Sequence, residues 1–93
     1  MTVSFKPEGY HTITPYLVVP DVAEQLEFLE AAFDAVVTER VSLSDGTVNH
    51  AEVAIGDSRL MIGRAPAGRP PTSAMLYVYV PDADATYRRA LDA

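Results

Sequence analysis

The chain has 93 residues, 48% of them hydrophobic, which suits one small globular domain spanning residues 1–93. Its formal net charge is −6 and its seven Lys and Arg residues are scattered, which argues against a nucleic-acid partner and against an anionic membrane surface. The sequence contains no cysteine, no targeting sequence at its start and no apolar run of membrane-spanning length, so we expect a cytoplasmic protein without disulfides or thiolate chemistry.

The beginning of the chain predicts a strand followed by a helix. Residues 1–9 show no period and predict a mobile lead-in. Alternation between two faces predicts a strand over His11–Val19, with Pro15 at a sheet edge because proline lacks a backbone donor. Asp21 is a suitable N-cap for the helix that follows. The apolar positions of this helix recur at helical spacing: Val22, Leu26, Leu29 and Phe33.

Three further strands are expected before residue 64. They cover Val36–Leu43, Thr47–Ile55 and Ser58–Gly63, and each is enriched in β-branched or apolar residues. Ser44-Asp45-Gly46 and Gly56-Asp57 are turn signals between them. The pattern predicts an antiparallel meander.

His50 and Glu52 are the first candidates for chemistry. Regular alternation in Thr47–Ile55 places Val48, His50, Glu52 and Ala54 on one face and Asn49, Ala51, Val53 and Ile55 on the other. His50 and Glu52 would then jointly bind a metal, or act as a base and its orienter, or make polar contacts to a ligand, or form a structural pair. A metal site would need a third ligand, from His11, from a missing region or from a second copy of the chain.

The end of the chain repeats its beginning. After a proline-rich linker at 64–73, the segment Tyr77–Asp82 matches Tyr16–Asp21 at its tyrosine, final valine, proline and aspartate. We therefore expect residues 74–93 to begin a second module. Its strand would turn Ala74, Leu76, Val78 and Val80 toward a helix and Met75, Tyr77 and Tyr79 away from it, and Asp82 would cap a helix with Ala83, Tyr87 and Leu91 at helical spacing.

Four segments carry a resemblance to a known family: Thr14-Pro-Tyr-Leu-Val-Val-Pro-Asp21, Glu27-Phe-Leu-Glu-Ala-Ala-Phe33, Asn49-His-Ala-Glu-Val-Ala-Ile-Gly-Asp-Ser58 and Leu60-Met-Ile62. Their order resembles the vicinal-oxygen-chelate superfamily of glyoxalases, bleomycin-resistance proteins and extradiol dioxygenases, and most closely its PhnB-like branch. The resemblance implies an α+β fold: a βαβββ module over residues 10–63 plus the first strand and helix of a second module, in a mixed or antiparallel sheet that forms half of a cleft.

The same resemblance implies that two complete modules enclose a cleft for a small molecule, often over a metal. Because the second module here is incomplete, we expect either a fragment or a homodimer in which a second copy supplies the missing strands. The metal-binding position on the first strand of each module falls at Thr14 and at Met75, and neither side chain binds a divalent metal well. The expected ligand on the fourth strand is also missing, since only Ser58–Gly63 is present there. No cofactor is therefore expected, with a divalent metal as the alternative.

Three functions follow as hypotheses. The first is metal-free binding of a small organic molecule in the cleft. The second is a metal-dependent lyase, isomerase or dioxygenase, in which His50 and Glu52 are the candidate catalytic residues and metal ligands. The third is a degenerate module that serves dimerisation only. The candidate ligand-binding residues are Thr14, Tyr16, His50, Glu52, Met75, Tyr77 and Tyr79.

Overall fold

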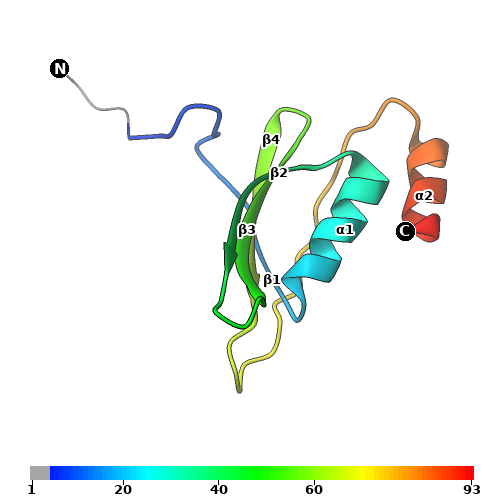
Figure 1. The fold of residues 1–93 in the computed structure, drawn as a ribbon. Coiled ribbons are helices and arrows are strands. Elements are labelled where there is room, and N and C mark those ends of the chain that lie inside the picture. Colours follow the sequence, from blue (N-terminus) through cyan, green and yellow to red (C-terminus); the bar gives the residue numbers. More distant parts are fainter. Residues whose placement is uncertain (1–4) are drawn as a thin grey trace.

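The computed structural model describes residues 5–93, in which one four-stranded sheet and two helices form (Figure 1). The part of the expected lead-in at residues 1–4 lies outside the described residues. Neither helix within 5–93 is long and apolar enough to cross a membrane. The elements in chain order are β1 (Tyr16–Val19), α1 (Val22–Phe33), β2 (Val36–Ser42), β3 (Val48–Ile55), β4 (Ser58–Arg64) and α2 (Ala83–Asp92).

The sheet is mixed, with the strand order β1-β4-β3-β2. Strands β2, β3 and β4 form the expected antiparallel meander, whereas β1 lies parallel to β4 at the edge. The expectation of a strand from His11 is wrong, because pairing with β4 begins only at Tyr16. Pro15 directly precedes it, and the Pro15 carbonyl accepts the Met61 N–H at 3.0 Å. Proline thus contributes the one ladder group it has, at a sheet edge, as predicted.

Helix α1 begins and ends at recognisable caps. The side chain of Asp21 accepts the backbone N–H of Glu24 at 3.1 Å, which confirms the predicted N-cap. Asp34 ends the helix in the left-handed region, at φ 56°. The buried side of the helix consists of Val22, Leu26, Leu29 and Ala32, while the expected Phe33 is only partly buried.

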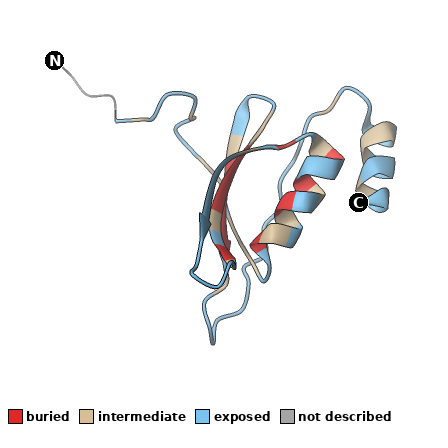
Figure 2. Cartoon of the chain, viewed as in Figure 1, coloured by how far each residue is buried: buried red, intermediate tan, exposed pale blue. Residues whose placement is uncertain are grey.

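The core lies between α1 and one face of the sheet (Figure 2). Its largest fully buried side chains are Leu26 and Val22 from α1, Val53 from β3 and Ile62 from β4. Burying a side chain of this size contributes about 1.5–3 kcal/mol. No residue of α2 is buried, so the second helix adds little to this core.

Two β-bulges change the expected faces of the sheet. One lies between Val37 and Glu39 in β2, and the other interrupts the pairing where Val41 faces His50 and Ser42 faces Val48. The second bulge leaves Asn49 without a partner in the register, so Val48 turns into the core and Asn49 is exposed. The expectation that Val48 shares the face of His50 is therefore wrong.

The second module differs from expectation in its strand. Residues 74–81 form no strand and pair with none of the four strands of the described sheet, so they lack the ladder that a strand requires. The helix does form, and the Asp82 side chain accepts the Ala85 N–H at 3.1 Å as its predicted N-cap. Its expected apolar stripe is not packed, since Tyr87 is 64% and Leu91 66% exposed.

Arg89 attaches α2 to the C-terminal end of α1. Its guanidinium donates to the Ala31 carbonyl at 2.9 and 3.1 Å and to both carboxylate oxygens of Asp34, at 2.6 and 3.1 Å. A cation is favoured there because the last carbonyls of α1 lack partners within their own helix. Figure 1 shows α2 on the side of α1 that faces away from the sheet.

Candidate functional site

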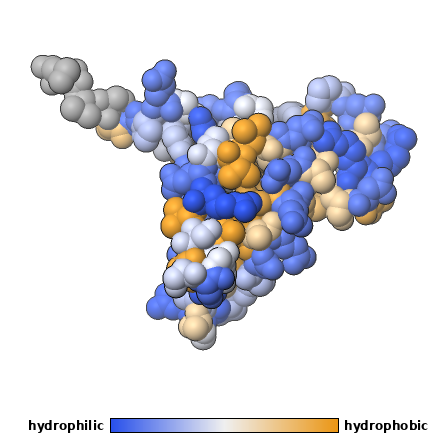
Figure 3. All heavy atoms as spheres, viewed as in Figure 1, coloured by the Kyte–Doolittle hydropathy of each residue, from blue (hydrophilic) through white to orange (hydrophobic). Residues whose placement is uncertain are grey.

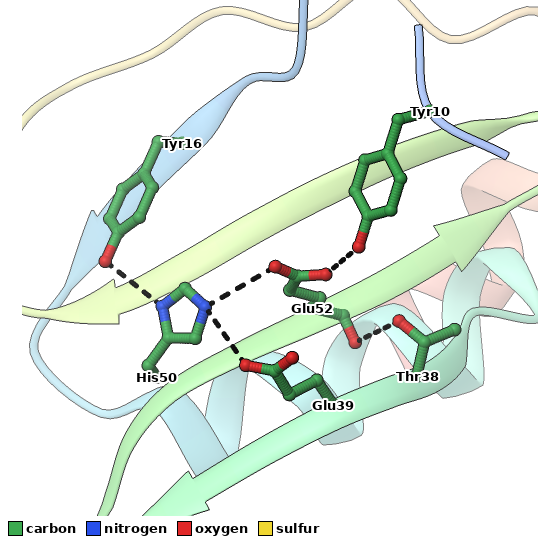
Figure 4. A network of polar contacts seen from close by, with 6 residues as sticks. All are labelled: Tyr10, Tyr16, Thr38, Glu39, His50 and Glu52. Atoms are coloured by element: carbon green, nitrogen blue, oxygen red, sulfur yellow. Dashed lines mark hydrogen bonds and ion pairs between the residues drawn. The ribbon is translucent and has the colours of Figure 1, made fainter. Parts of the chain in front are cut away.

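A polar cluster lies on the sheet face that α1 leaves uncovered (Figure 4). The strand register sets its layout, because His50 pairs with Gly63 and Glu52 pairs with Met61, and Met61 also pairs with Tyr16 of β1. Side chains from β2 and β3, from β1 on the far side of β4, and from the segment before β1 therefore meet over the middle of the sheet. The members are Tyr10, Tyr16, Thr38, Glu39, His50 and Glu52.

Glu52 is the buried carboxylate of this cluster, with 8% of the residue exposed. Its Oε2 accepts a hydrogen bond from the Tyr10 hydroxyl, and its backbone carbonyl accepts one from Thr38 Oγ1 at 3.2 Å. The hydrogen bond to Glu52 raises the pKa of Tyr10, and partial desolvation raises it further. The guanidinium of Arg59 lies 5.0 Å from the centre of the Tyr10 ring and opposes this rise.

The two ring nitrogens of His50 face different members of the cluster. Its Nδ1 lies 3.2 Å from the Tyr16 hydroxyl, and the two rings are tilted by 34° with their centres 5.7 Å apart. Its Nε2 faces two carboxylates, with Glu52 Oε1 at 3.8 Å and Glu39 Oε1 at 3.9 Å. The prediction that His50 and Glu52 point the same way is confirmed.

Glu39 is the cluster member that regular alternation places on the wrong face. Val37 packs against the core, so an unbroken strand would also turn Glu39 toward α1. The bulge at Thr38 shifts the register by one residue and sets Glu39 opposite Glu52. Thr38 then bonds the Glu52 carbonyl through its side chain. Tyr10 was also missed, because it lies between the expected lead-in of residues 1–9 and the strand expected from His11, where no local pattern indicates a role.

The expected cleft residues divide between two hollows. A hollow of about 270 Å³ beside the cluster is lined by Tyr10, Thr14, Glu52 and Met61, among others. A larger groove of about 560 Å³ is lined by His11, Thr14, Tyr77 and Tyr79 together with the end of α1. His50 and Tyr16 do not line the larger groove, so the described residues do not join Tyr77 and Tyr79 to the polar cluster.

The side chains of the second module are open to solvent. Met75 is 95% exposed, Tyr77 85% and Tyr79 90%, and the rings of Tyr77 and Tyr79 contact each other at 5.1 Å between centres. Their ligand-binding role stays a prediction. In Figure 3, apolar atoms reach the surface in the middle of the visible face, between hydrophilic residues.

Comparison with known proteins establishes the fold. No family model matches the chain. An uncharacterized protein of Mycobacterium bovis is 31% identical over 104 residues, covering 100% of this chain and 66% of the relative. An uncharacterized protein of Mycobacterium tuberculosis is also 31% identical, and the chain spans 59% of its length. The crystal structure of TioX from Micromonospora sp. ML1 superposes with a TM-score of 0.61 at 21% identity, covering 88% of this chain and 71% of TioX. The chain thus has a glyoxalase-like α+β fold whose sheet is not closed.

Proposed function

We propose that the uncovered sheet face binds a small organic molecule, as in the glyoxalase and bleomycin-resistance proteins of the PhnB-like branch. The observation that carries the proposal is the nearly buried Glu52 carboxylate on the face that α1 does not cover. A carboxylate is costly to bury, and the Tyr10 hydroxyl offsets part of that cost. Such a group, oriented beside a hollow and flanked by His50, is typical of a ligand-binding site.

The chemistry of the face favours a neutral or cationic ligand. Glu39 and Glu52 are acceptors, and the formal net charge of −6 disfavours anions. Tyr16 and Met61 offer an aromatic ring and a soft thioether for the apolar part of the molecule.

A second copy of the chain is proposed to complete the cleft. Within residues 5–93 no strand pairs with the outer edge of β1, so this edge can pair with another chain, and exposed apolar side chains are present on the same molecule. The hollow of about 270 Å³ beside Glu52 is small for a ligand pocket, which supports a cleft shared between two modules. Exposed apolar side chains that dimerisation would cover are Ile13, Met75, Tyr77 and Tyr79.

The proposal is tested by screening neutral, cationic and anionic aromatic fragments against ¹⁵N-labelled protein in the presence of EDTA. We expect neutral or cationic fragments to shift the amides of β3 and β4 around His50 and Glu52. The variants His50→Ala and Glu52→Gln should weaken that binding at least about tenfold, which corresponds to about 1.4 kcal/mol.

Two matched variants serve as controls for the screen. Glu27→Gln removes an exposed carboxylate of α1, and Tyr87→Phe removes an exposed hydroxyl of α2, so both should bind as the wild type does. Shifts confined to the helices, or binding that survives loss of His50, would contradict the proposal. If no fragment binds while light scattering shows a dimer, the chain serves dimerisation alone.

A further inference from the structure

We infer that Glu39, His50 and Glu52 form a binding site for one divalent transition-metal cation, on strands β2 and β3. This site differs from the positions at Thr14 and Met75 where the family resemblance places a metal ligand. It occupies the same open face as the proposed organic ligand, but it does not depend on that ligand.

The donor atoms already lie close to a coordinating arrangement. His50 Nε2 is 3.8 Å from Glu52 Oε1 and 3.9 Å from Glu39 Oε1, and the three donor atoms lie within 4.8 Å of one another. Two donors held at about 2.0–2.2 Å from zinc at the tetrahedral angle are about 3.4 Å apart. Only a small closing movement is needed, and the Glu39 side chain, which is 53% exposed, has room to make it.

Hydrogen bonds from outside the donor set orient two of the three ligands. The Tyr16 hydroxyl lies against His50 Nδ1, and in the tautomer that donates from Nδ1 the lone pair of Nε2 points at the carboxylates. Tyr10 bonds Glu52 Oε2, which leaves Glu52 Oε1 as the oxygen facing His50. Metal-binding histidines and carboxylates are held by partners of this kind.

The charge of the cluster also favours a cation. Even when His50 is protonated, two carboxylates and one imidazolium carry an excess of negative charge. The Glu52 side chain is 10% exposed, so solvent screens its charge poorly. A divalent cation between the three groups would neutralise this excess.

The donor set selects the kind of metal. One imidazole nitrogen and two carboxylate oxygens suit Zn²⁺, Mn²⁺, Fe²⁺, Co²⁺ or Ni²⁺. Mg²⁺ and Ca²⁺ favour sets made of oxygen alone, so they should bind more weakly. Three protein ligands leave the remaining coordination positions open to water.

The test is titration of chelator-treated, tag-free protein with Co²⁺, followed by visible absorption, and with Zn²⁺, followed by calorimetry. We expect one cation per chain. His50→Ala and Glu39→Gln should abolish the cobalt absorption or weaken binding at least about tenfold, and Tyr16→Phe should weaken binding about tenfold by releasing the His50 ring. Glu39 is exposed, so Glu39→Gln should fold normally, which circular dichroism checks.

The chain offers matched controls for both ligand types. His11→Ala removes the other histidine, which is exposed, and Glu24→Gln removes an exposed carboxylate of α1. Both should bind cobalt as the wild type does. Absence of cobalt binding, or binding unchanged in His50→Ala and Glu39→Gln, would overturn the inference. The fragment screen is run in EDTA, so the two proposals can fail separately. Fragment binding without cobalt binding would overturn only the metal site. Cobalt binding without fragment binding would overturn only the proposal of an organic ligand.

Discussion

The ring of Tyr16 in β1 lies directly over the backbone of Gly63 in β4. A Cβ atom at position 63 would come within 2.8 Å of Tyr16 Cε1 and 2.9 Å of Cζ, well inside normal contact distance. Gly63 is buried and pairs with His50 on its other side. The missing side chain at position 63 is therefore what allows the Tyr16 hydroxyl to reach His50 Nδ1.

Replacing Gly63 by alanine should displace Tyr16 from His50. We expect the variant Gly63→Ala to lower the free energy of unfolding by about 1–3 kcal/mol, the usual cost of overpacking. Urea denaturation followed by circular dichroism measures this change. In a Tyr16→Ala background the overlap disappears, so there the same substitution should cost much less. An equal cost in both backgrounds would show that the Tyr16 ring is not the obstacle.

The hydrogen bond between Tyr10 and Glu52 predicts a stability change at alkaline pH. The pKa of Tyr10 is raised above its usual 10.0, mainly by this hydrogen bond. Its contribution to stability should be fully present below the unfolded-state pKa and be lost as the pH rises through the folded-state value. Between pH 8 and 11 the midpoint temperature of thermal unfolding should therefore fall more steeply in the wild type than in the Tyr10→Phe variant. Parallel curves for the two proteins would refute the contact.

The attachment of α2 should fail at acid pH. The hydrogen bonds and charge of Arg89 hold the pKa of Asp34 below its usual 3.8. The contribution of this pair is present above the unfolded-state pKa and is lost as the pH falls through the lower folded-state value. Amide exchange of Ala83–Asp92, corrected for the intrinsic rate, should thus stay slow down to about pH 4 and speed up below it. At neutral pH the α2 amides of the Arg89→Gln variant should already exchange fast. Those of Arg88→Gln, a substitution at the neighbouring residue, should exchange as slowly as in the wild type.

Replacing a core leucine should lower the free energy of unfolding far more than replacing a surface leucine. The side chain of Leu26 in α1 points toward the sheet and is 0% exposed, so Leu26→Ala should lower the free energy of unfolding by about 2–5 kcal/mol. Leu91 in α2 is 66% exposed, so Leu91→Ala should stay within about 0.5 kcal/mol of the wild type. Chemical denaturation of both variants checks the pair. A large loss in Leu91→Ala would mean that α2 packs on a surface, such as a second copy, in solution.

Local signals made most of the fold predictable. The Asp21 and Asp82 caps, the helical spacing of Val22, Leu26 and Leu29, and the glycine turns each depend on neighbouring residues only, and each is found as predicted. The prediction of a strand over residues 74–80 was wrong because strand formation depends on more than neighbouring residues. A strand requires a partner, and the sequence of that segment does not state where its partner lies.

The candidate site was predictable only in part. His50 and Glu52 share one face because β3 is regular between them, so alternation sufficed. Tyr10 contacts Glu52 across 42 positions of sequence, and no local pattern encodes such a contact. Glu39 was missed because a bulge reverses the alternation, and a bulge has no reliable signal in a single sequence.

The bulge at Thr38 also decides which sign of charge β2 presents beside the histidine. With the bulge, Glu39 lies opposite Glu52 and Arg40 lies opposite Ala51, on the side of α1. An unbroken ladder continuing from Val37 would place Arg40 opposite His50 instead, so a guanidinium would replace the carboxylate. Deleting Thr38 removes the extra residue and keeps Glu39 in place, whereas straightening the strand with Thr38 retained would put the Arg40 guanidinium beside His50 and leave Glu52 as the remaining carboxylate.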